Sequence, residues 1–374
     1  MKILIYSHVF YPSIGGIEIV SATLADYLVK NGYQVTVVTS TPSQTKDLFP
    51  YQVIRQPSFL QKLKLVKTHD IIHSNGASMA LFFYAKLLRK PFLWTHGGYQ
   101  LSCIDGLGWV NGEEAPLNPR DSIHYHFKKF GFKHAFKEGF KLYLRRWVGK
   151  KVDANIAITH WVAQRQALPN QVVIYNPFPL EHFYNITRSA ITPFDFIYVG
   201  RLVSEKGLPT LIDAFHQLSI NLPNTKLSLA IVGDGDWRSK IELKVKDLQL
   251  SQEITFWGKK SGTDLYDIIS KAKIAIVPSL WEEPMGGVAI ELMAAGKNMI
   301  VSKNGGLAEC VGKAALTFDN GNSQQLAEQM KTLYLDKTLQ ENQLLLLSKQ
   351  LEQFNPNNLT KQYIKLYKKV SRNF

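Results

Sequence analysis

Two glutamates frame a glycine pair in the segment SLWEEPMGGVAIELMAAGK, which spans Ser279–Lys297 and follows an apolar run. Glu283 and Glu291 are separated by seven residues, and Gly286 and Gly287 lie between them, where we expect a helix to begin. Backbone N–H groups and the positive end of the helix dipole at such a start favour a phosphate. A glutamate one turn into that helix can accept hydrogen bonds from a ribose diol. The spacing alone fits a capped surface helix with two solvated acids equally well.

Two cations follow a second apolar run, in the segment VGRLVSEKG at Val199–Gly207. Arg201 and Lys206 stand five positions apart on an expected turn that leads into a helix over Leu208–Leu218. This pair can clamp a diphosphate, Arg201 with its planar fork of donors and Lys206 as a point charge. Alone, such cations are more often solvated surface residues.

An acidic turn at Ile231–Asp236, with the sequence IVGDGD, superficially resembles a metal-binding pattern. Asp234 and Asp236 are spaced like the carboxylates of an Asp-x-Asp site. Calcium and magnesium sites need further oxygen ligands, and no additional cluster of carboxylates or histidines accompanies this pair in the sequence. We therefore interpret the segment as a strand-to-helix turn at Gly233 and predict no metal site.

The first half of the chain contributes a glycine pair and a histidine. In PSIGGIE, at Pro12–Glu18, Gly15 and Gly16 allow the backbone to approach a phosphate at the start of a helix. The pattern differs from the G-x-G-x-x-G dinucleotide motif, so a nicotinamide cofactor has little support. His96, in LWTHGGYQ, follows an expected strand and precedes two glycines. A lone histidine is often structural, but this position is also typical of site residues.

These residues depend on an alternation of short apolar strands and helical stretches, which is typical of parallel α/β sheets. A helix is expected over Glu18–Asn31. In the first half we expect strands at Lys2–Tyr6, Gln34–Ser40, Asp70–Ser74, Phe92–His96, Ala154–Thr159 and Gln171–Tyr175. A second series follows at Phe194–Val199, Lys226–Val232, Ile254–Trp257, Ile274–Pro278 and Met299–Ser302.

The two series are joined by the segment IYNPFPLEHFYN, where Pro177 and Pro179 disfavour regular structure. The basic tail Asn358–Val370 has helical spacing and matches the charge of the first half. We therefore predict two doubly wound domains, residues 1–180 and residues 181–357, with a helix in 358–374 that crosses back onto the first. Ligands of such sheets bind beyond the carboxyl ends of the strands, where the candidate residues lie.

Composition and charge narrow the class of protein further. A chain of 374 residues favours two domains, and no run of 18 apolar residues predicts a membrane-spanning helix. The opening MKILIYSHVFYP is interpreted as a strand rather than a signal peptide, and two cysteines favour a reducing cytoplasm. The net charge is +14, of which residues 1–185 carry +10 and residues 359–374 carry +5. This asymmetry indicates a polyanionic partner, either nucleic acid or an anionic membrane surface.

Together these residues resemble the retaining glycosyltransferases of family 4, which have the GT-B fold. The resemblance covers nearly the whole chain and rests on GG-x-E, T-H-G, G-R-L-x-x-E-K-G, V-G-D-G, N-G-G and the two spaced glutamates. It implies an α/β architecture of two Rossmann-like doubly wound domains that face each other across a cleft. The N-terminal domain would bind the acceptor and the C-terminal domain the nucleotide sugar, with the C-terminal helix crossing back to the N-terminal domain.

By this resemblance, the enzyme would transfer a hexose from a UDP- or GDP-sugar to an acceptor hydroxyl with retention, in cell-surface polysaccharide or glycolipid synthesis, and would require no cofactor. Arg201 and Lys206 would neutralise the leaving diphosphate, Glu291 would hold the ribose, and Glu283 would contact the sugar. His96 would lie near the reacting face. The residues expected to contact the donor are Gly15, Gly16, Arg201, Lys206, Gly233, Gly258, Lys259, Glu283, Met285, Gly286, Gly287 and Glu291.

The acceptor side is assigned to the long segment 99–150, in which Tyr99, Asp105 and Trp109 are candidate contacts. A basic stripe there repeats every four residues, as expected for a single helix: Lys129, Lys133, Lys137, Lys141 and Arg145. An aromatic-rich stripe runs beside it: Phe132, Phe136, Phe140 and Leu144. This pattern is typical of an interfacial helix, so we expect a cytoplasmic protein attached peripherally to the inner face of an anionic membrane. The alternative is that the aromatic residues pack into the domain and the lysines are merely solvated.

Two rival functions remain open at this point. A nucleotide-sugar 2-epimerase has the same architecture but needs neither an acceptor-binding segment nor a basic face. A nucleic-acid-binding protein would use the positive charge, but the chain has no recognisable nucleic-acid-binding module. That reading would also leave the cation and glutamate motifs unexplained, so no nucleic-acid partner is expected.

Overall fold

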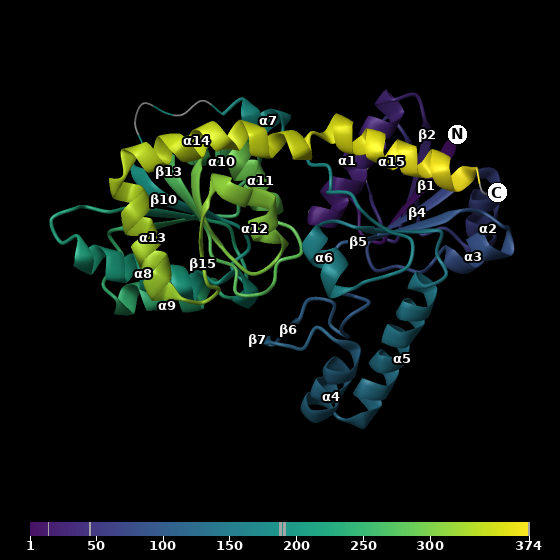
Figure 1. Cartoon of the computed structure of the whole chain (residues 1–374), viewed down its shortest axis with the longest axis horizontal. Helices are drawn as coiled ribbons and strands as arrows, with labels where there is room; N and C mark the ends of the chain where they lie inside the picture. The colour runs from purple at the N-terminus through teal and green to yellow at the C-terminus, as the bar shows by residue number, and fades with distance from the viewer. Residues whose placement is uncertain (14, 45, 187–188, 190–191, 373–374) are drawn as a thin grey trace. The chain divides into compact units, whose positions relative to one another are not determined.

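The computed structural model describes residues 1–13, 15–44, 46–186, 189 and 192–372 (Figure 1). It divides into two compact units. The first comprises Met1–Val110, Glu114–Pro179 and the described chain from Gln353 onward, and the second comprises Leu180–Glu352 together with Asn111–Glu113. Ile14, within the predicted glycine-pair turn, lies outside the described residues, as do residues 373–374 of the predicted crossing segment.

The first unit is built on a parallel sheet with the strand order β3-β2-β1-β4-β5-β8-β9. The interior of β1 is an uninterrupted apolar run and is buried, as expected for a strand covered on both faces. The strands are β1 (Lys2–Ser7), β2 (Gln34–Thr39), β3 (Gln52–Arg55), β4 (Ile71–Asn75), β5 (Phe92–His96), β8 (Ala154–Ala157) and β9 (Gln171–Val173). A separate two-stranded pair is formed by β6 (Trp109–Val110) and β7 (Glu113–Glu114).

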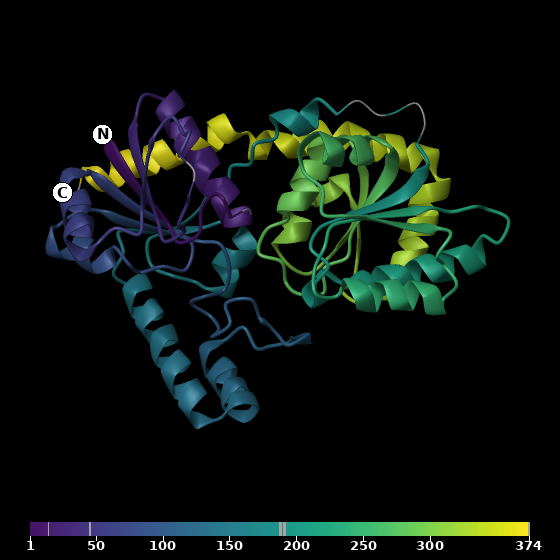
Figure 2. The same ribbon diagram turned by 180° about the vertical axis from the view of Figure 1, so that it is seen from behind.

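Helices cover this sheet, and a hairpin of two helices projects from it (Figures 1 and 2). The helix after β1 begins at the predicted glycine pair and ends before Asn31 and Gly32. The helices are α1 (Gly16–Lys30), α2 (Phe59–Thr68), α3 (Phe82–Leu87), α4 (Pro119–Phe130), α5 (Phe132–Gly149), α6 (His160–Arg165) and α15 (Pro356–Ser371). Among the described residues, every helix is too short or too polar to span a bilayer.

The C-terminal helix α15 packs onto the first unit, which confirms the predicted crossing. Leu359, Tyr363 and Tyr367 join the core formed by β1, β4 and α1. The ring of His73 on β4 lies 2.7 Å from the Tyr367 hydroxyl through Nδ1 and 2.7 Å from Thr95 Oγ1 through Nε2. Burial lowers the pKa of His73 to about 3, so the ring is neutral and both nitrogens serve as hydrogen-bonding groups.

The second unit contains a parallel sheet with the order β12-β11-β10-β13-β14-β15. This order reverses between β10 and β13, which creates a switch point beside the first strand of the unit, where ligands of open α/β sheets bind. The strands are β10 (Phe194–Val199), β11 (Leu229–Val232), β12 (Ile254–Gly258), β13 (Ala272–Val277), β14 (Asn298–Ser302) and β15 (Leu316–Phe318). The two parallel sheets confirm the predicted doubly wound α/β class.

Helices cover both faces of the second sheet and enclose an apolar core that includes Phe196, Ile231, Ile276 and Ile300. They are α7 (Glu181–Tyr184), α8 (Leu208–Asn221), α9 (Arg238–Asp247), α10 (Gly262–Ser270), α11 (Gly287–Ala294), α12 (Gly306–Val311), α13 (Ser323–Leu335) and α14 (Lys337–Leu351). Short 3₁₀ turns occupy Ser204–Lys206, Gly312–Ala314 and Glu352–Phe354. The loops after β10 and β13 carry the predicted cations and glutamates.

Candidate active site

An ion pair joins the two loops at the switch point of the second unit. Lys206 follows β10, Glu283 follows β13, and the Lys206 Nζ lies 2.5 Å from the Glu283 Oε1. Their side chains are 16% and 12% exposed, so both charges are mostly withdrawn from water but remain accessible. Residues 77 positions apart are thus brought together because β10 and β13 are neighbours in the sheet.

The second oxygen of Glu283 is also occupied. The Ser279 hydroxyl donates to Glu283 Oε2 at 2.6 Å, and this bond is buried. On the cation side, Lys206 Nζ lies 5.7 Å from the centre of the Trp281 ring, within cation–π range. Ser279 and Trp281 were not predicted as site residues. The available signal was that both lie in the same loop as Glu283, directly after β13.

Arg201 occupies a different environment from Lys206. Its guanidinium is 68% exposed and lies 3.2 Å from the carboxylate of Glu205, a pair within one turn of chain. The Arg201 carbonyl accepts a hydrogen bond of 2.7 Å from the buried Tyr198 hydroxyl. The backbone is therefore held in place, while the side chain can reorient toward an incoming anion. Breaking the exposed ion pair with Glu205 costs little free energy.

Glycines allow the loops of this unit to approach one another closely. Gly207 has φ +69°, and a Cβ at that position would lie 1.8 Å from the carbonyl oxygen of Pro278. Gly233 has φ +146°, and a Cβ there would lie 1.8 Å from the carbonyl oxygen of Gly200. Because both obstacles are backbone atoms, neither position accommodates another residue without displacing a strand–loop connection.

The predicted glycine pair marks the start of α11, as expected. Gly286 is the N-cap residue and Gly287 begins the helix, while Met285 before them is buried. The backbone of Glu283 is fixed by a bridge to Gly305, and its carbonyl accepts from the Gly306 N–H at 2.7 Å. The first turn of α11 therefore offers N–H groups in the same loop that carries Glu283.

Glu291 lies one turn into α11 and is partly buried. Desolvation raises the pKa of its carboxyl to about 7, which is well above the ordinary value of 4.5. Burial and, second to it, the charge of Glu291 raise the pKa of Tyr266 on α10. A carboxyl that titrates near neutrality within an otherwise apolar helix is typical of a functional position.

The remaining donor candidates of the second unit lie at neighbouring strand ends. Gly258 ends β12, and its carbonyl accepts from the Gly233 N–H at 2.9 Å, while Lys259 next to it is exposed. Asp234 accepts from the Gly235 N–H at 2.8 Å and lies 3.4 Å from Arg238. Among the described residues, no three His, Cys, Asp or Glu side chains are grouped so that they could hold a metal ion.

His96 ends β5 of the first unit and is fully buried. Its Nε2 lies 2.8 Å from Asn155 Oδ1. The amide nitrogen of Asn155 donates to the Gly149 and Pro169 carbonyls, so its oxygen must face the ring, and the His96 Nε2 carries the proton. Burial lowers the pKa of His96 to about 4. The imidazole is therefore neutral, with Nδ1 left as an acceptor, and it is unsuited to donate a proton from a charged form.

The other glycine pair starts α1, where the chain supplies its own anion. Gly15 is the N-cap residue with extended backbone, and Gly16 begins the helix. The Glu18 carboxylate folds back over this turn, because a Cβ on Gly15 would lie 2.7 Å from Glu18 Oε2. Ser13 Oγ holds the other oxygen at 2.8 Å. A phosphate at this helix start would have to compete with the Glu18 carboxylate for the backbone N–H groups. This competition was not predicted.

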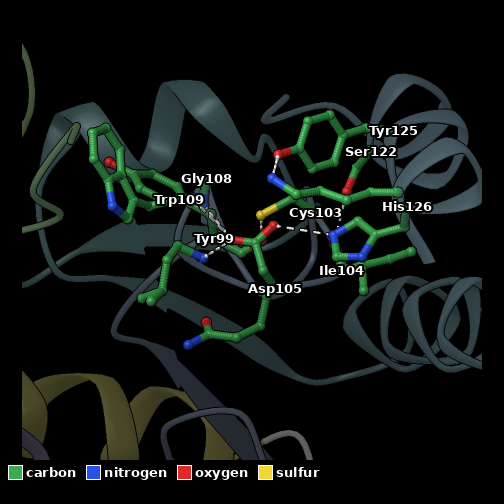
Figure 3. A network of polar contacts seen from close by, with 12 residues as sticks. Tyr99, Cys103, Ile104, Asp105, Gly108, Trp109, Ser122, Tyr125 and His126 are labelled. Atoms are coloured by element: carbon green, nitrogen blue, oxygen red, sulfur yellow. Dashed lines mark hydrogen bonds and ion pairs between the residues drawn. The ribbon is translucent and has the colours of Figure 1, made fainter. Parts of the chain in front are cut away.

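The acceptor-side candidates belong to a loop that is pinned to α4 (Figure 3). Asp105 Oδ1 accepts from the backbone N–H groups of Leu107, Gly108 and Trp109, and Oδ2 faces the His126 ring at 3.7 Å. Asp105 thus shapes the loop. Tyr99 is fully buried, so its ring supports the loop from within, whereas Trp109 on β6 is partly exposed.

The predicted single basic helix is wrong, because Gly131 at φ +82° ends α4 and starts α5. Lys129 therefore lies on α4, where it donates to the Tyr125 hydroxyl at 2.9 Å. Arg145 lies on α5 but turns inward, with its guanidinium 3.5 Å from the Gln100 carbonyl and its pKa lowered by burial. The three remaining members of the stripe share one side of α5: Lys133, Lys137 and Lys141.

Comparison with known proteins agrees with this geometry. Residues 185–344 match the family model of glycosyl transferases group 1, and residues 14–182 match that of glycosyltransferase family 4. An uncharacterized glycosyltransferase of Methanocaldococcus jannaschii is 27% identical over 91% of this chain and 92% of its own length. The lipopolysaccharide 1,2-N-acetylglucosaminetransferase of Salmonella typhimurium is 35% identical over 36% of this chain and 35% of its own.

A solved structure shares the fold over almost the entire length. The Anabaena protein HepE, in complex with UDP and glucose, superposes with a TM-score of 0.71 at 20% identity, covering 98% of this chain and 99% of that one. Two parallel doubly wound sheets, together with the two family matches, define a glycosyltransferase of the GT-B fold. The chain belongs to the glycosyltransferases of group 1 and family 4.

Proposed function

We propose that this glycosyltransferase moves a hexose from a UDP- or GDP-sugar to an acceptor hydroxyl with retention of the anomeric configuration. The observation that carries the proposal is the ion pair between Lys206 and Glu283 at the switch point beside β10 and β13. It holds an ammonium group in the same loop cluster as the first turn of α11. Positive charge fixed in advance is what a departing diphosphate needs.

The roles of the cations follow from their surroundings. Lys206 is held by Glu283 and is mostly covered, so its charge is positioned before the substrate binds. Arg201 is exposed and its side chain pairs with Glu205, so its fork can swing onto the diphosphate. N–H groups in the first turn of α11 add the positive end of the helix dipole.

The state of Glu283 bears on how retention would be achieved. Its two carboxylate oxygens accept from Lys206 and Ser279, at 2.5 and 2.6 Å. A carboxylate whose oxygens are both hydrogen-bonded is a poor nucleophile, which disfavours a covalent glycosyl-enzyme. We assign attack and departure to the same face of the sugar, with Glu283 orienting Lys206 and contacting the sugar hydroxyls, and Glu291 holding the ribose.

The biological setting is proposed from a relative. The Salmonella typhimurium relative acts on lipopolysaccharide by its name, and we infer a role in cell-surface polysaccharide or glycolipid synthesis. The acceptor is assigned to the first unit, near Trp109. His96, neutral and fixed by Asn155, is assigned to position backbone and sugar hydroxyls rather than to protonate a leaving group.

A matched pair of variants tests the proposal. Lys273 and Asp195 form a second ion pair between the same two strands, at their opposite ends, with 2.7 Å between Nζ and Oδ1. Arg201→Ala combined with Lys206→Ala should lower turnover at least about 100-fold, whereas Lys273→Ala should leave it near wild type. Turnover is followed as nucleoside diphosphate release, and the anomer of the product by NMR.

Three results would count against the proposal. Equal turnover in the double variant and in Lys273→Ala would place the diphosphate elsewhere. A product of inverted configuration would exclude the same-face mechanism. Conversion of the donor to its C2 epimer without any acceptor would identify the epimerase instead.

A further inference from the structure

Helix α5 presents a row of aromatic side chains to the outside of the first unit. They are between 49% and 68% exposed, which contradicts the alternative that they pack into the domain. Their spacing of four, four, three and four residues keeps them on one side of a helix with 3.6 residues per turn. This aromatic face of α5 consists of Phe132, Phe136, Phe140, Tyr143 and Trp147.

Another side of α5, about a quarter turn around the helix from the aromatic face, is already used for packing. Its buried residues are small or aliphatic, including Ala135, Gly139 and Leu142. A Cβ on Gly139 would lie 3.2 Å from Ile123 of α4, so the two helices of the hairpin approach closely. The hairpin extends away from the sheet of its unit in both views (Figures 1 and 2). The aromatic face therefore lies to the side of the contact that holds the hairpin together and is left uncovered by it.

Exposed apolar residues also occur on the two helices near the C-terminal end of α5. Trp147 packs edge-on against Phe82 of α3, with 6.1 Å between ring centres, and Phe59 of α2 contacts Tyr84 of α3 at 5.2 Å. The exposed apolar residues of these two helices are Phe59, Leu60, Phe83 and Leu87. A monomeric protein rarely exposes a large apolar surface unless that surface is used.

The charged residues around this surface are almost all basic. Segments 59–68, 82–90 and 132–151, which contain α2, α3 and α5, hold 13 Lys and Arg residues and a single acid. That acid, Glu138, pairs with Lys141 at 2.7 Å. Lys133 and Lys137 are exposed directly beside the aromatic face. This lysine-rich surround is complementary to a surface of dense negative charge.

We propose that the aromatic face of α5, with the neighbouring apolar residues of α2 and α3, docks onto an anionic lipid bilayer. Aromatic and aliphatic side chains enter the headgroup region while the flanking lysines contact lipid phosphates. Protein–protein interfaces are depleted in lysine, which disfavours a protein partner. Nucleic acid would stack bases on aromatic rings but would leave the exposed leucines of α2 and α3 without a role. This attachment is independent of the transfer chemistry proposed above.

Vesicle co-sedimentation of the full chain tests the proposal without an activity readout. Wild type should bind phosphatidylcholine vesicles containing 30% phosphatidylglycerol at 0.05 M salt and release as salt shortens the Debye length to about 3 Å at 1 M. Vesicles of pure phosphatidylcholine should bind at least tenfold less. Wild type that ignores the anionic vesicles at low salt would overturn the proposal.

Two triple variants of α5 and a control separate the contribution of the aromatic side chains from that of the lysine charges. Lys133→Glu with Lys137→Glu and Lys141→Glu should weaken binding about 100-fold or more. Phe132→Ser with Phe136→Ser and Phe140→Ser keeps every charge and should weaken it at least tenfold at each salt concentration. The control, Lys226→Glu with Lys240→Glu and Lys246→Glu, reverses three exposed lysines of the second unit and should bind as wild type.

The pattern across these variants decides the outcome. If the control detaches as strongly as the α5 lysine variant, binding reflects net charge and the proposal is wrong. The proposal also fails if the aromatic variant binds as wild type, or if wild type forms a dimer that the aromatic variant abolishes. Circular dichroism and donor affinity should be unchanged in all three, because the altered side chains are at the surface and outside the donor site.

Discussion

Replacing Glu291 by glutamine should stabilise the protein and at the same time weaken its binding of the donor. The carboxyl sits in α11 with a pKa raised by desolvation from 4.5 to about 7. Because the folded-state value lies above the unfolded value, the folded protein holds the proton more tightly between these two pH values. The stability of wild type therefore falls as pH rises through this window and is lowest above pH 7.

The size of the effect follows from the same two pKa values. A difference of about 2.5 pKa units corresponds to about 3 kcal/mol at pH 8, and only about 1 kcal/mol has been lost at pH 5. Glu291→Gln carries no charge and should not show this loss. The variant should gain about 2 kcal/mol relative to wild type between pH 5 and pH 8.

Denaturant titrations at pH 5, 6, 7 and 8 measure the free energy of unfolding of wild type and Glu291→Gln. Glu328→Gln, at an exposed position on α13, is the control and should follow wild type. Donor affinity is measured with an intact nucleotide sugar, because a terminal phosphate titrates near pH 6 and would confuse the profile. Wild-type affinity should rise from pH 6 to pH 8, and the variant should bind about 10- to 100-fold more weakly at pH 8, with no such rise.

Two results would refute this reasoning. If Glu291→Gln follows wild type in stability at every pH, the carboxyl is not desolvated in the folded chain. If stability shifts as expected but affinity for every nucleotide sugar is unchanged, Glu291 is a buried acid without a role in donor binding.

Three further predictions concern the backbone, the crossing helix and metal dependence. Gly207→Ala should lower the free energy of unfolding by more than about 4 kcal/mol, because its Cβ would meet the Pro278 carbonyl. Gly262→Ala, also at positive φ but in open space, is the control and should lower it by about 1–2 kcal/mol. Equal losses would show that the loop around Gly207 can move to accept the side chain. Tyr367→Phe should lower stability by about 1–3 kcal/mol by leaving His73 Nδ1 without its partner, and Tyr143→Phe at the surface is the control; no loss would mean that the bond contributes little. Activity should survive excess EDTA, because Lys206, Arg201 and the α11 N-terminus supply the positive charge; full inhibition reversed by Mg²⁺ would restore the metal interpretation of Asp234 and Asp236.

The arrangement of strands could be predicted from the sequence because buried parallel strands are uninterrupted apolar runs. This held for β1, and for the stretch Phe196–Tyr198 of β10 that follows the buried Asp195. The edge strands β3 and β15 were missed, because QVIR is half exposed and LTF has only three residues. These two edge strands lack the apolar signal, whereas the edge strands β9 and β12 were predicted.

The candidate site was predictable as a set of loops but not as a set of contacts. Placing Lys206 and Glu283 after strands put them at one edge of the sheet. Their pairing depends on β10 and β13 being neighbours in the sheet. The order of strands in a sheet belongs to the tertiary structure and cannot be seen in the sequence of either loop. The contacts of Ser279 and Glu18 were not predicted, because a serine or a helix-start glutamate is common and only the folded backbone turns them onto Glu283 and Gly15.

The helical hairpin shows where a periodic pattern misleads. Basic residues every four positions from Lys129 to Arg145 fit one helix, yet Gly131 breaks the chain into two. A glycine with positive φ ends a helix even when the side-chain pattern continues. The break also lets α4 fold back against α5, and the aromatic face of α5 lies outside that contact and stays exposed.

The central claim is that Lys206, held by Glu283, recognises the diphosphate of the donor. Calorimetric titration of UDP, GDP and their parent nucleosides into wild type, Lys206→Ala and Lys273→Ala tests it most directly. Whichever diphosphate binds wild type should bind Lys206→Ala about 10- to 100-fold more weakly, while nucleoside affinity stays unchanged and Lys273→Ala behaves as wild type. Equal diphosphate affinity in Lys206→Ala and wild type would contradict the claim.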